Sequence, residues 1–125
     1  MAKPKILIAE DDALLRSIYQ KKFALGGYDI QTVCDGEEAL NVLATVKPDM
    51  LILDINMPKV DGFQVLEHFP KETRTFPIIM LTNFDQVDYR TKGAELGADE
   101  FFIKKDMTIH SLLDMVDVLL KKAKK

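Results

Sequence analysis

The sequence has few features that would place the protein outside the cell or in a membrane. Its 125 residues include one cysteine, Cys34, so no internal disulfide can form, which favours a reducing compartment. The N-terminus lacks the succession of basic, apolar and small residues that marks a signal peptide. No apolar run approaches the roughly 20 residues needed to span a bilayer. We therefore expect a cytoplasmic protein without membrane insertion.

An excess of basic charge is also lacking. The chain has 17 Lys and Arg residues against 20 Asp and Glu residues, a formal net charge of −3. Such a chain has no overall field to hold it on nucleic acid, so we expect no direct nucleic-acid binding. The basic tail at residues 121–125 is an exception, which we interpret as a solvated helix end. Because no linker-like tract or internal repeat interrupts the chain, we expect one domain over residues 1–125.

Short apolar runs alternate with segments of helical period. Four runs lack polar alternation, as expected of strands buried on both faces of a parallel sheet: Ile6–Ala9, Met50–Leu53, Ile78–Leu81 and Phe101–Ile103. The segment Tyr28–Val33 alternates instead, which indicates an edge strand. Since helical segments lie between the strands, the pattern predicts a doubly wound α/β sandwich built from right-handed βαβ units.

The helical segments carry their own start signals. The first is predicted to begin after Asp12, acting as its cap, and the second at Asp35, with Glu38 as a capping-box partner. The segment Asp85–Leu96 has the thinnest apolar face, and Gly93 inside it costs roughly 1 kcal/mol relative to alanine. We interpret that segment as a weakly anchored helix. The last helix has an apolar stripe made of Ile109, Leu112, Leu113, Val116 and Leu120.

Charged residues gather at the carboxyl ends of the predicted strands, where open α/β sheets bind their ligands. The first strand is followed by the acidic run at residues 10–12, the third ends in Asp54, the fourth in Thr82 and the fifth in Lys104. If the first and third strands are neighbours, at least three carboxylates converge near a lysine. Carboxylates this close repel one another, so either their pKa values rise or a cation is present. Mg²⁺ suits such a site, because it takes one or two carboxylates together with waters and a phosphoryl oxygen.

Four segments in this order resemble the receiver domain of two-component response regulators, of the single-domain kind found in chemotaxis. The segments are ILIAEDD, LILDINMPKVDGF, IIMLT and GADEFFIK, and the resemblance covers essentially the whole chain. Asp54 follows Asp11 by 43 residues, Thr82 follows Asp54 by 28, and Lys104 follows Thr82 by 22. The resemblance implies a flavodoxin-like (βα)5 fold with the parallel strand order 2-1-3-4-5.

Carried over residue by residue, the resemblance makes Asp54 the acceptor of a phosphoryl group from a histidine kinase or a histidine phosphotransfer protein. It implies a Mg²⁺ site formed by the side chains of Asp11 and Asp54 and the backbone carbonyl of Asn56. Glu10 would hold a metal-bound water, and Lys104 would pair with a phosphoryl oxygen. The chain is then not a conventional enzyme. With Mg²⁺ it would take up phosphate from a phosphodonor and lose it slowly.

The resemblance also implies a two-state switch. Thr82 would turn inward to hydrogen-bond the phosphoryl group, and Phe101 would rotate into the space that Thr82 leaves. The Asp85–Leu96 helix, the fifth strand and the last helix would form the surface that reads this change. An unidentified downstream protein would dock there.

Three residues depart from the family's pattern. Lys105 stands where proline usually follows the lysine, and a cis bond before a non-proline residue costs about 2.5–4 kcal/mol, so this loop is expected to be trans or strained. Asn83 stands where a small residue usually follows the threonine, and its side chain would either narrow phosphoryl access or add a hydrogen bond. Phe84 cannot orient a hydrolytic water by hydrogen bonding. We therefore expect a fairly long-lived phosphorylated state.

Other function classes fit the residues less well. A flavin-binding flavodoxin-like protein needs a phosphate loop after the first strand, where this chain has an acidic run. An aspartate-pair phosphatase needs a second acid two residues after the nucleophile, where this chain has Asn56. The remaining alternative is a receiver-like interaction module that works without phosphate. Cys34 is followed by Asp35 and not by a basic residue, so we interpret it as structural, and His68 and His110 as surface residues.

Overall fold

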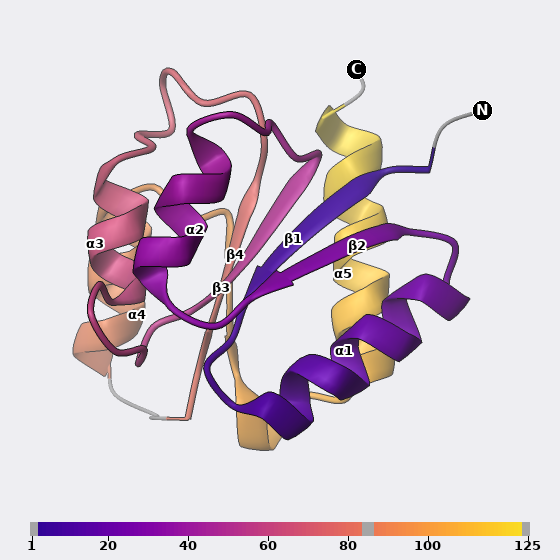
Figure 1. Cartoon of the computed structure of the whole chain (residues 1–125). Helices are drawn as coiled ribbons and strands as arrows, with labels where there is room; N and C mark the ends of the chain where they lie inside the picture. The colour runs from indigo at the N-terminus through magenta and orange to yellow at the C-terminus, as the bar shows by residue number, and fades with distance from the viewer. Residues whose placement is uncertain (1–2, 84–86, 124–125) are drawn as a thin grey trace.

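The computed structural model describes residues 3–83 and 87–123 and shows a parallel sheet between two layers of helices (Figure 1). The sheet order is β2-β1-β3-β4-β5. This confirms the order that the resemblance implies, and every predicted strand lies within one residue of its expected bounds. The strands are β1 (Lys5–Ala9), β2 (Asp29–Val33), β3 (Met50–Asp54), β4 (Ile78–Thr82) and β5 (Glu100–Ile103).

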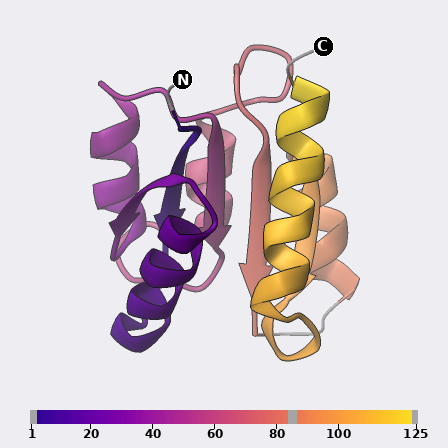
Figure 2. The same cartoon turned by 90° about the vertical axis from the view of Figure 1, so that its right-hand side faces the viewer.

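The helices cover both faces of the sheet, which makes the fold doubly wound. One face carries α1 (Ala13–Leu25) and α5 (Ile109–Ala123), which lie nearest the viewer in Figure 2. The opposite face carries α2 (Gly36–Leu43), α3 (Gly62–Glu67) and α4 (Val87–Glu95). A short 3-10 turn, η1 (Lys104–Asp106), joins β5 to α5. None of the described helices is long and apolar enough to cross a membrane.

Burial along the strands follows from this layering. Every residue of β3 and β4 is buried, because both strands have neighbours on both sides and helices on both faces. In β2, exposed and half-buried positions alternate up to the buried Val33, as predicted for an edge strand. One core packs Tyr19 and Phe23 of α1 and Leu112 and Val116 of α5 against the sheet. The other packs α2, α3 and part of α4. These cores hold the carboxyl ends of the strands in fixed positions.

The predicted caps of the first two helices are confirmed, with one difference. The backbone N–H of Leu15 donates to Asp12 over 3.0 Å, and that of Glu38 donates to Asp35 over 2.8 Å. The carboxylate of Glu38, however, accepts from the backbone N–H of Cys34 rather than from that of Asp35. The expected capping box is therefore displaced by one residue.

Close packing explains the glycine inside the helix that the sequence predicts to be weakly anchored. Gly93 is buried in α4, and a Cβ atom there would lie 3.3 Å from the ring of Phe101 and 3.4 Å from the sulfur of Met80. The missing side chain lets α4 approach β4 and β5 closely. Asp85, the predicted first residue of this helix, lies outside the described residues, and α4 is described from Val87.

Gly62 begins α3 at a point where two backbone segments touch. Its N–H donates to the carbonyl of Ile55 over 2.8 Å. A Cβ atom at this position would lie 2.5 Å from the carbonyl oxygen of Asp54 and 2.7 Å from the Cα atom of Ile55. Any larger residue must therefore displace the backbone that follows β3.

We predict that Gly62→Ala lowers the free energy of unfolding by about 2–4 kcal/mol, because the new methyl group has no space beside the backbone. Gly27→Ala is the control. Gly27 has φ +92° and nothing within 4 Å of its Cβ position, so only backbone strain of about 1 kcal/mol is expected. Urea unfolding of both variants measures the difference. Equal losses of stability would show that the close approach at Gly62 is unimportant.

Candidate functional site

The residues predicted to form the site come together at the carboxyl edge of the sheet, where the strand arrows in Figure 2 point. Strand register places Ala9 beside Leu53, and Thr82 beside Ile103. Glu10, the end of β3, the end of β4 and Lys104 therefore follow one another across neighbouring strands. The sheet alone brings together side chains that are far apart in the sequence.

Lys104 joins two of the carboxylates. Its Nζ atom donates to Oε1 of Glu10 over 2.6 Å and to Oδ2 of Asp54 over 3.1 Å. The Lys104 side chain is only 9% exposed, so water screens these pairs weakly. Every peptide bond among the described residues is trans, including the one before Lys105. The replacement of the usual proline therefore leaves the lysine aimed at the site.

Three carboxylates lie close enough to share one cation. Oxygens of Glu10, Asp11 and Asp54 all lie within 4.8 Å of one another. Glu10 and Asp54 are buried, whereas Asp11 is exposed, so the group opens to solvent on the side of Asp11. Carboxylate oxygens are hard donors, and this donor set fits a divalent cation such as Mg²⁺. The structure thus brings together the three acids that the sequence singled out.

The charge of Lys104 does not fully offset the two buried carboxylates, Glu10 and Asp54. Burial, together with the charge of Glu10, raises the pKa of Asp54 from its ordinary 3.8 to about 8, although Lys104 acts in the opposite direction. Burial alone would lower the pKa of Lys104, but its hydrogen bond to Glu10 and the charge of Asp54 outweigh burial and raise it. The site therefore holds a proton at neutral pH unless a further cation replaces it.

Two supporting residues were not identified from the sequence. Nη1 of Arg16 donates to the backbone carbonyls of Glu10 (2.9 Å) and Asp11 (3.0 Å), which fixes the acidic loop. A positive charge in the first turn of a helix interacts unfavourably with the helix dipole. The position of Arg16 near the start of α1 was therefore the one sign in the sequence that this residue has a specific role. Tyr19 packs below the site: burial first, and then the charges of nearby acids including Glu10, raise the pKa of its hydroxyl.

The residues predicted to switch lie next to the acids. Thr82 is fully buried, and its hydroxyl donates to Oδ1 of Asn56 over 3.2 Å. Phe101 is half-buried on β5, with the guanidinium carbon of Arg90 5.2 Å from its ring centroid. Asn83 is exposed. Phe84, on which the expected phosphate lifetime depends, lies outside the described residues.

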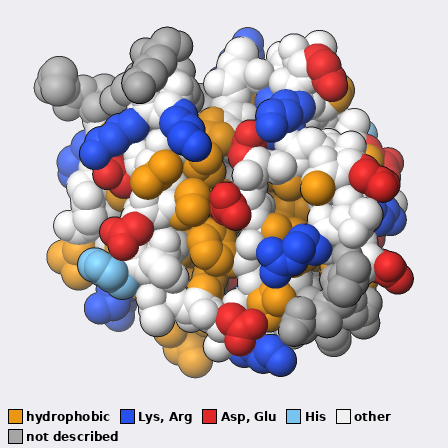
Figure 3. All heavy atoms as spheres, turned by 180° about the vertical axis from the view of Figure 1, so that it is seen from behind, with side chains coloured by type: hydrophobic (Ala, Val, Ile, Leu, Met, Phe, Trp, Pro, Cys, Tyr) orange, Lys and Arg blue, Asp and Glu red, His pale blue; other side chains and the backbone are white. Residues whose placement is uncertain are grey.

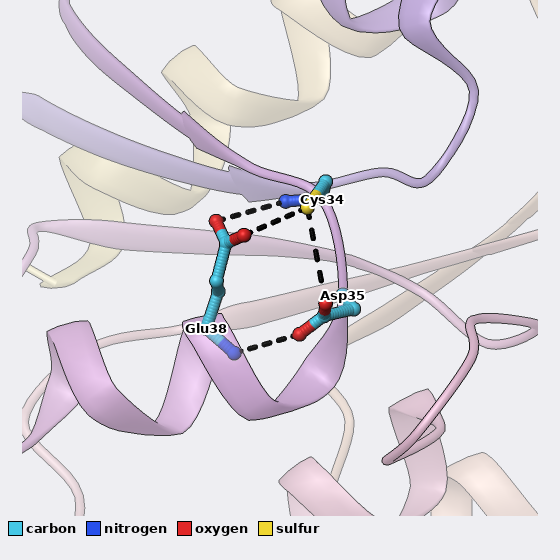
Figure 4. A group of neighbouring side chains, drawn as sticks. All are labelled: Cys34, Asp35 and Glu38. Carbon is cyan, nitrogen blue, oxygen red and sulfur yellow. Dashed lines mark hydrogen bonds between the residues drawn. The ribbon is translucent and has the colours of Figure 1, made fainter.

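A second group of potential metal ligands lies at the start of α2 (Figure 4). There the thiol of Cys34 donates to Oε2 of Glu38 over 2.7 Å, and this hydrogen bond is the main cause that raises the pKa of the thiol. A thiol that keeps its proton is a poor metal ligand and a poor nucleophile. The contacts support the structural role predicted for Cys34. His68 and His110 are both exposed, as expected.

Comparisons with known proteins agree with this geometry. The family model of the response regulator receiver domain matches residues 6–117. The probable transcriptional regulator ycf27 of Porphyridium aerugineum is 40% identical over 123 residues, which cover 94% of this chain and 51% of that protein. The alkaline phosphatase synthesis transcriptional regulatory protein PhoP of Bacillus subtilis (strain 168) is 40% identical over 100 residues, which cover 80% of this chain and 42% of that protein. The chain thus spans about half the length of these curated relatives.

Solved structures show the same fold. The receiver domain of the Francisella response regulator 1452 has a TM-score of 0.89 and 31% sequence identity, and the match covers 96% of this chain and 98% of that one. A CheY-like receiver domain protein from Methanospirillum hungatei JF-1 has a TM-score of 0.92 at 21% identity, covering 98% of each chain, and supports the fold alone. With its acidic site at the strand ends, the chain belongs to the receiver domain family of two-component response regulators.

Proposed function

We propose that the chain is a phosphorylation-activated signalling switch in which Asp54 accepts the phosphoryl group. The observation that carries this proposal is the position of Asp54. Its carboxylate is 3% exposed, lies 3.1 Å from the ammonium of Lys104 and shares a cation-sized group of oxygens with Glu10 and Asp11. A buried acid that one lysine leaves largely protonated is a weak source of stability, so we infer that the arrangement serves chemistry.

In the proposed reaction, an oxygen of the Asp54 carboxylate attacks the phosphorus of a phosphohistidine on a histidine kinase or phosphotransfer protein. A P–O bond forms and the P–N bond breaks, and the departing imidazole nitrogen keeps the electron pair and takes a proton from solvent. Lys104 is positioned to pair with an oxygen of the transferred group. Such transfer asks a protein mainly for positioning and charge neutralisation.

The donor set fits Mg²⁺, and we assign its ligands from the same residues. The side chains of Asp11 and Asp54 and the backbone carbonyl of Asn56 would bind the ion, with Glu10 holding a bound water. When bound, the ion supplies the positive charge that the site lacks. Asp54 then remains ionised at neutral pH and is able to act as a nucleophile.

The same site would report its state through Thr82 and Phe101. The hydroxyl of Thr82 points to Asn56, so a phosphoryl group on Asp54 offers it a stronger, charged acceptor. Phe101 packs closely against Gly93 of α4, where a Cβ atom would lie 3.3 Å from the ring, so a movement of the ring would act directly on α4. We propose that this coupling alters the surface of α4, β5 and α5, where a downstream protein docks.

We propose that residues 1–125 form one receiver domain, which acts in the cytoplasm. Two of its relatives are named as transcriptional regulators, and each is about twice the length that it shares with this chain. We propose that the shared half is the part that receives the phosphoryl group. No direct binding of nucleic acid is proposed for it.

The first experiment tests the acceptor. The wild-type chain, given Mg²⁺ and acetyl phosphate, is expected to gain the mass of one phosphoryl group, whereas Asp54→Asn is expected to gain none. Asp12→Asn is the matched control, because asparagine keeps the helix cap and the change removes an acid beside the site. Uptake by Asp54→Asn, or loss of uptake in Asp12→Asn alone, would show that the acceptor is assigned wrongly.

A second experiment tests the charge balance without metal. Because the pKa of Asp54 is about 8 in the folded state and 3.8 ordinarily, the folded state binds a proton that the unfolded state releases. The stability from this group is complete below about pH 4 and is lost as the pH rises through about 8. In EDTA at pH 8, Asp54→Asn should therefore be more stable than wild type by about 1–3 kcal/mol, with a flatter pH profile.

Urea unfolding between pH 5 and pH 8.5 measures this profile. Asp29→Asn is the control, since Asp29 is exposed on the edge strand and its replacement should leave the pH profile unchanged. A wild-type stability that does not fall with pH, or an Asp54→Asn variant less stable than wild type at pH 8, would contradict the proposed deficit of positive charge.

A third experiment tests the switch. Beryllofluoride with Mg²⁺ mimics the phosphoryl group, and we expect it to shift the ring resonances of Phe101 in the wild-type chain. In Thr82→Ala the mimic should still bind, but the shift at Phe101 should fall to less than about half, because the coupling hydroxyl is gone. Thr45→Ala, an exposed change on the α2–β3 connection, is the control. The absence of any wild-type response would favour an interaction module that works without phosphate.

A further inference from the structure

A depression of about 350 Å³ lies at the end of the sheet opposite to the acidic site. Its walls come from residues just before β4 and β5 and from the last turns of α5, among them Lys71, Arg74, Phe76, Asp99, Leu119 and Lys122. Several of these residues are exposed, so the depression is open to solvent. No part of it belongs to the site proposed for phosphorylation.

The charge of this depression is opposite to that of the chain. Its lining includes three cationic side chains and one carboxylate, Asp99, which both Arg74 and Lys71 contact. Two positive charges therefore remain in excess, although the whole chain carries −3. Figure 3 shows Lys and Arg side chains on both sides of the upper end of an apolar strip on this face. The lining of the depression is therefore net positive, whereas three carboxylates gather at the opposite end of the sheet.

Arg74 holds this part of the depression's lining in place. Its guanidinium donates to the carbonyls of Phe76 (2.8 Å), Phe69 (3.1 Å) and Gly97, and pairs with Asp99. Asp99 in turn accepts from the backbone N–H of Ile78 over 2.8 Å. The side chain of Arg74 is only 3% exposed. This network fixes the loop before β4 against the start of β5, so the depression is formed before any partner binds.

The floor is apolar while the rim is charged. Phe76 is buried, Pro77 and Leu119 are half-buried, and Lys71 and Lys122 are exposed beside them. An apolar centre with a charged rim is typical of protein interfaces. Small-molecule sites instead enclose most of the ligand surface, which an open depression does not do.

We propose that this depression, which we call the basal groove, is a docking site for an acidic peptide segment of a partner protein. An aliphatic or aromatic side chain of the segment would contact Phe76 and Leu119. Flanking carboxylates would pair with Lys71 and Lys122. The site requires no phosphate on Asp54, so its test stands apart from the proposed switch.

The test titrates the ¹⁵N-labelled, unphosphorylated chain with a synthetic peptide of sequence Glu-Glu-Phe-Leu-Glu-Glu. We expect a Kd of about 0.1–1 mM, with shifts at the amides of Thr75, Phe76, Asp99 and Leu119 that weaken as salt rises. The double variant Lys71→Glu, Lys122→Glu should bind about tenfold more weakly. Lys21→Glu, an exposed change on α1 outside the groove, should bind like wild type.

Competing occupants give different results. Equal binding of a peptide with Gln in place of every Glu would overturn the charge-based recognition, and so would unaltered binding to the double variant. Tighter binding of a DNA duplex or of anionic phosphatidylserine vesicles through the same amides would replace the peptide with another class of partner. Concentration-dependent shifts of these amides in the chain alone would identify a second copy as the occupant. No shift with 5 mM peptide would remove the proposal.

Discussion

The ammonium of Lys104 lies between the buried carboxylates of Glu10 and Asp54, and the rest of the site depends on this interaction. It links the ends of β1, β3 and β5, which are brought together only by the sheet order. Burial, together with the charge of Glu10, raises the pKa of Asp54 to about 8, and this one lysine offsets the rise only in part. Oxygens of Glu10, Asp11 and Asp54 lie within 4.8 Å of one another, and this donor set fits a divalent cation, which would supply further positive charge.

The fold tolerates this unfavourable site because it is stabilised elsewhere. The strands β3 and β4 are completely buried, and two separate cores pack against the faces of the sheet. Close backbone contact at Gly62 and the guanidinium of Arg16 hold the loops around the acids in place. An unfavourable group of buried charges at one end of a rigid, well-packed sheet is the arrangement expected of a functional site.

The sequence was sufficient for the strands, the edge position of Tyr28–Val33 and the caps at Asp12 and Asp35, because these depend on local pattern and short-range hydrogen bonds. The residues of the acidic site were also identifiable, since parallel strands place their carboxyl ends together. Arg16 and the Arg74–Asp99 network were not, because the sequence pattern does not show which backbone carbonyls an arginine side chain will contact. The role of Gly93 was likewise hidden, since the contact with Phe101 is set by how α4 packs on the sheet.

We propose that Asp54 holds the phosphoryl group as an acyl phosphate. Reduction of the phosphorylated chain with borohydride, followed by peptide sequencing in a mass spectrometer, tests this most directly, because an aspartyl phosphate is reduced to homoserine while a free aspartate is not. We expect homoserine at position 54, only after incubation with phosphodonor and Mg²⁺. Homoserine at position 11 or 12, or a phosphate that resists borohydride and stays on another residue type, would contradict it.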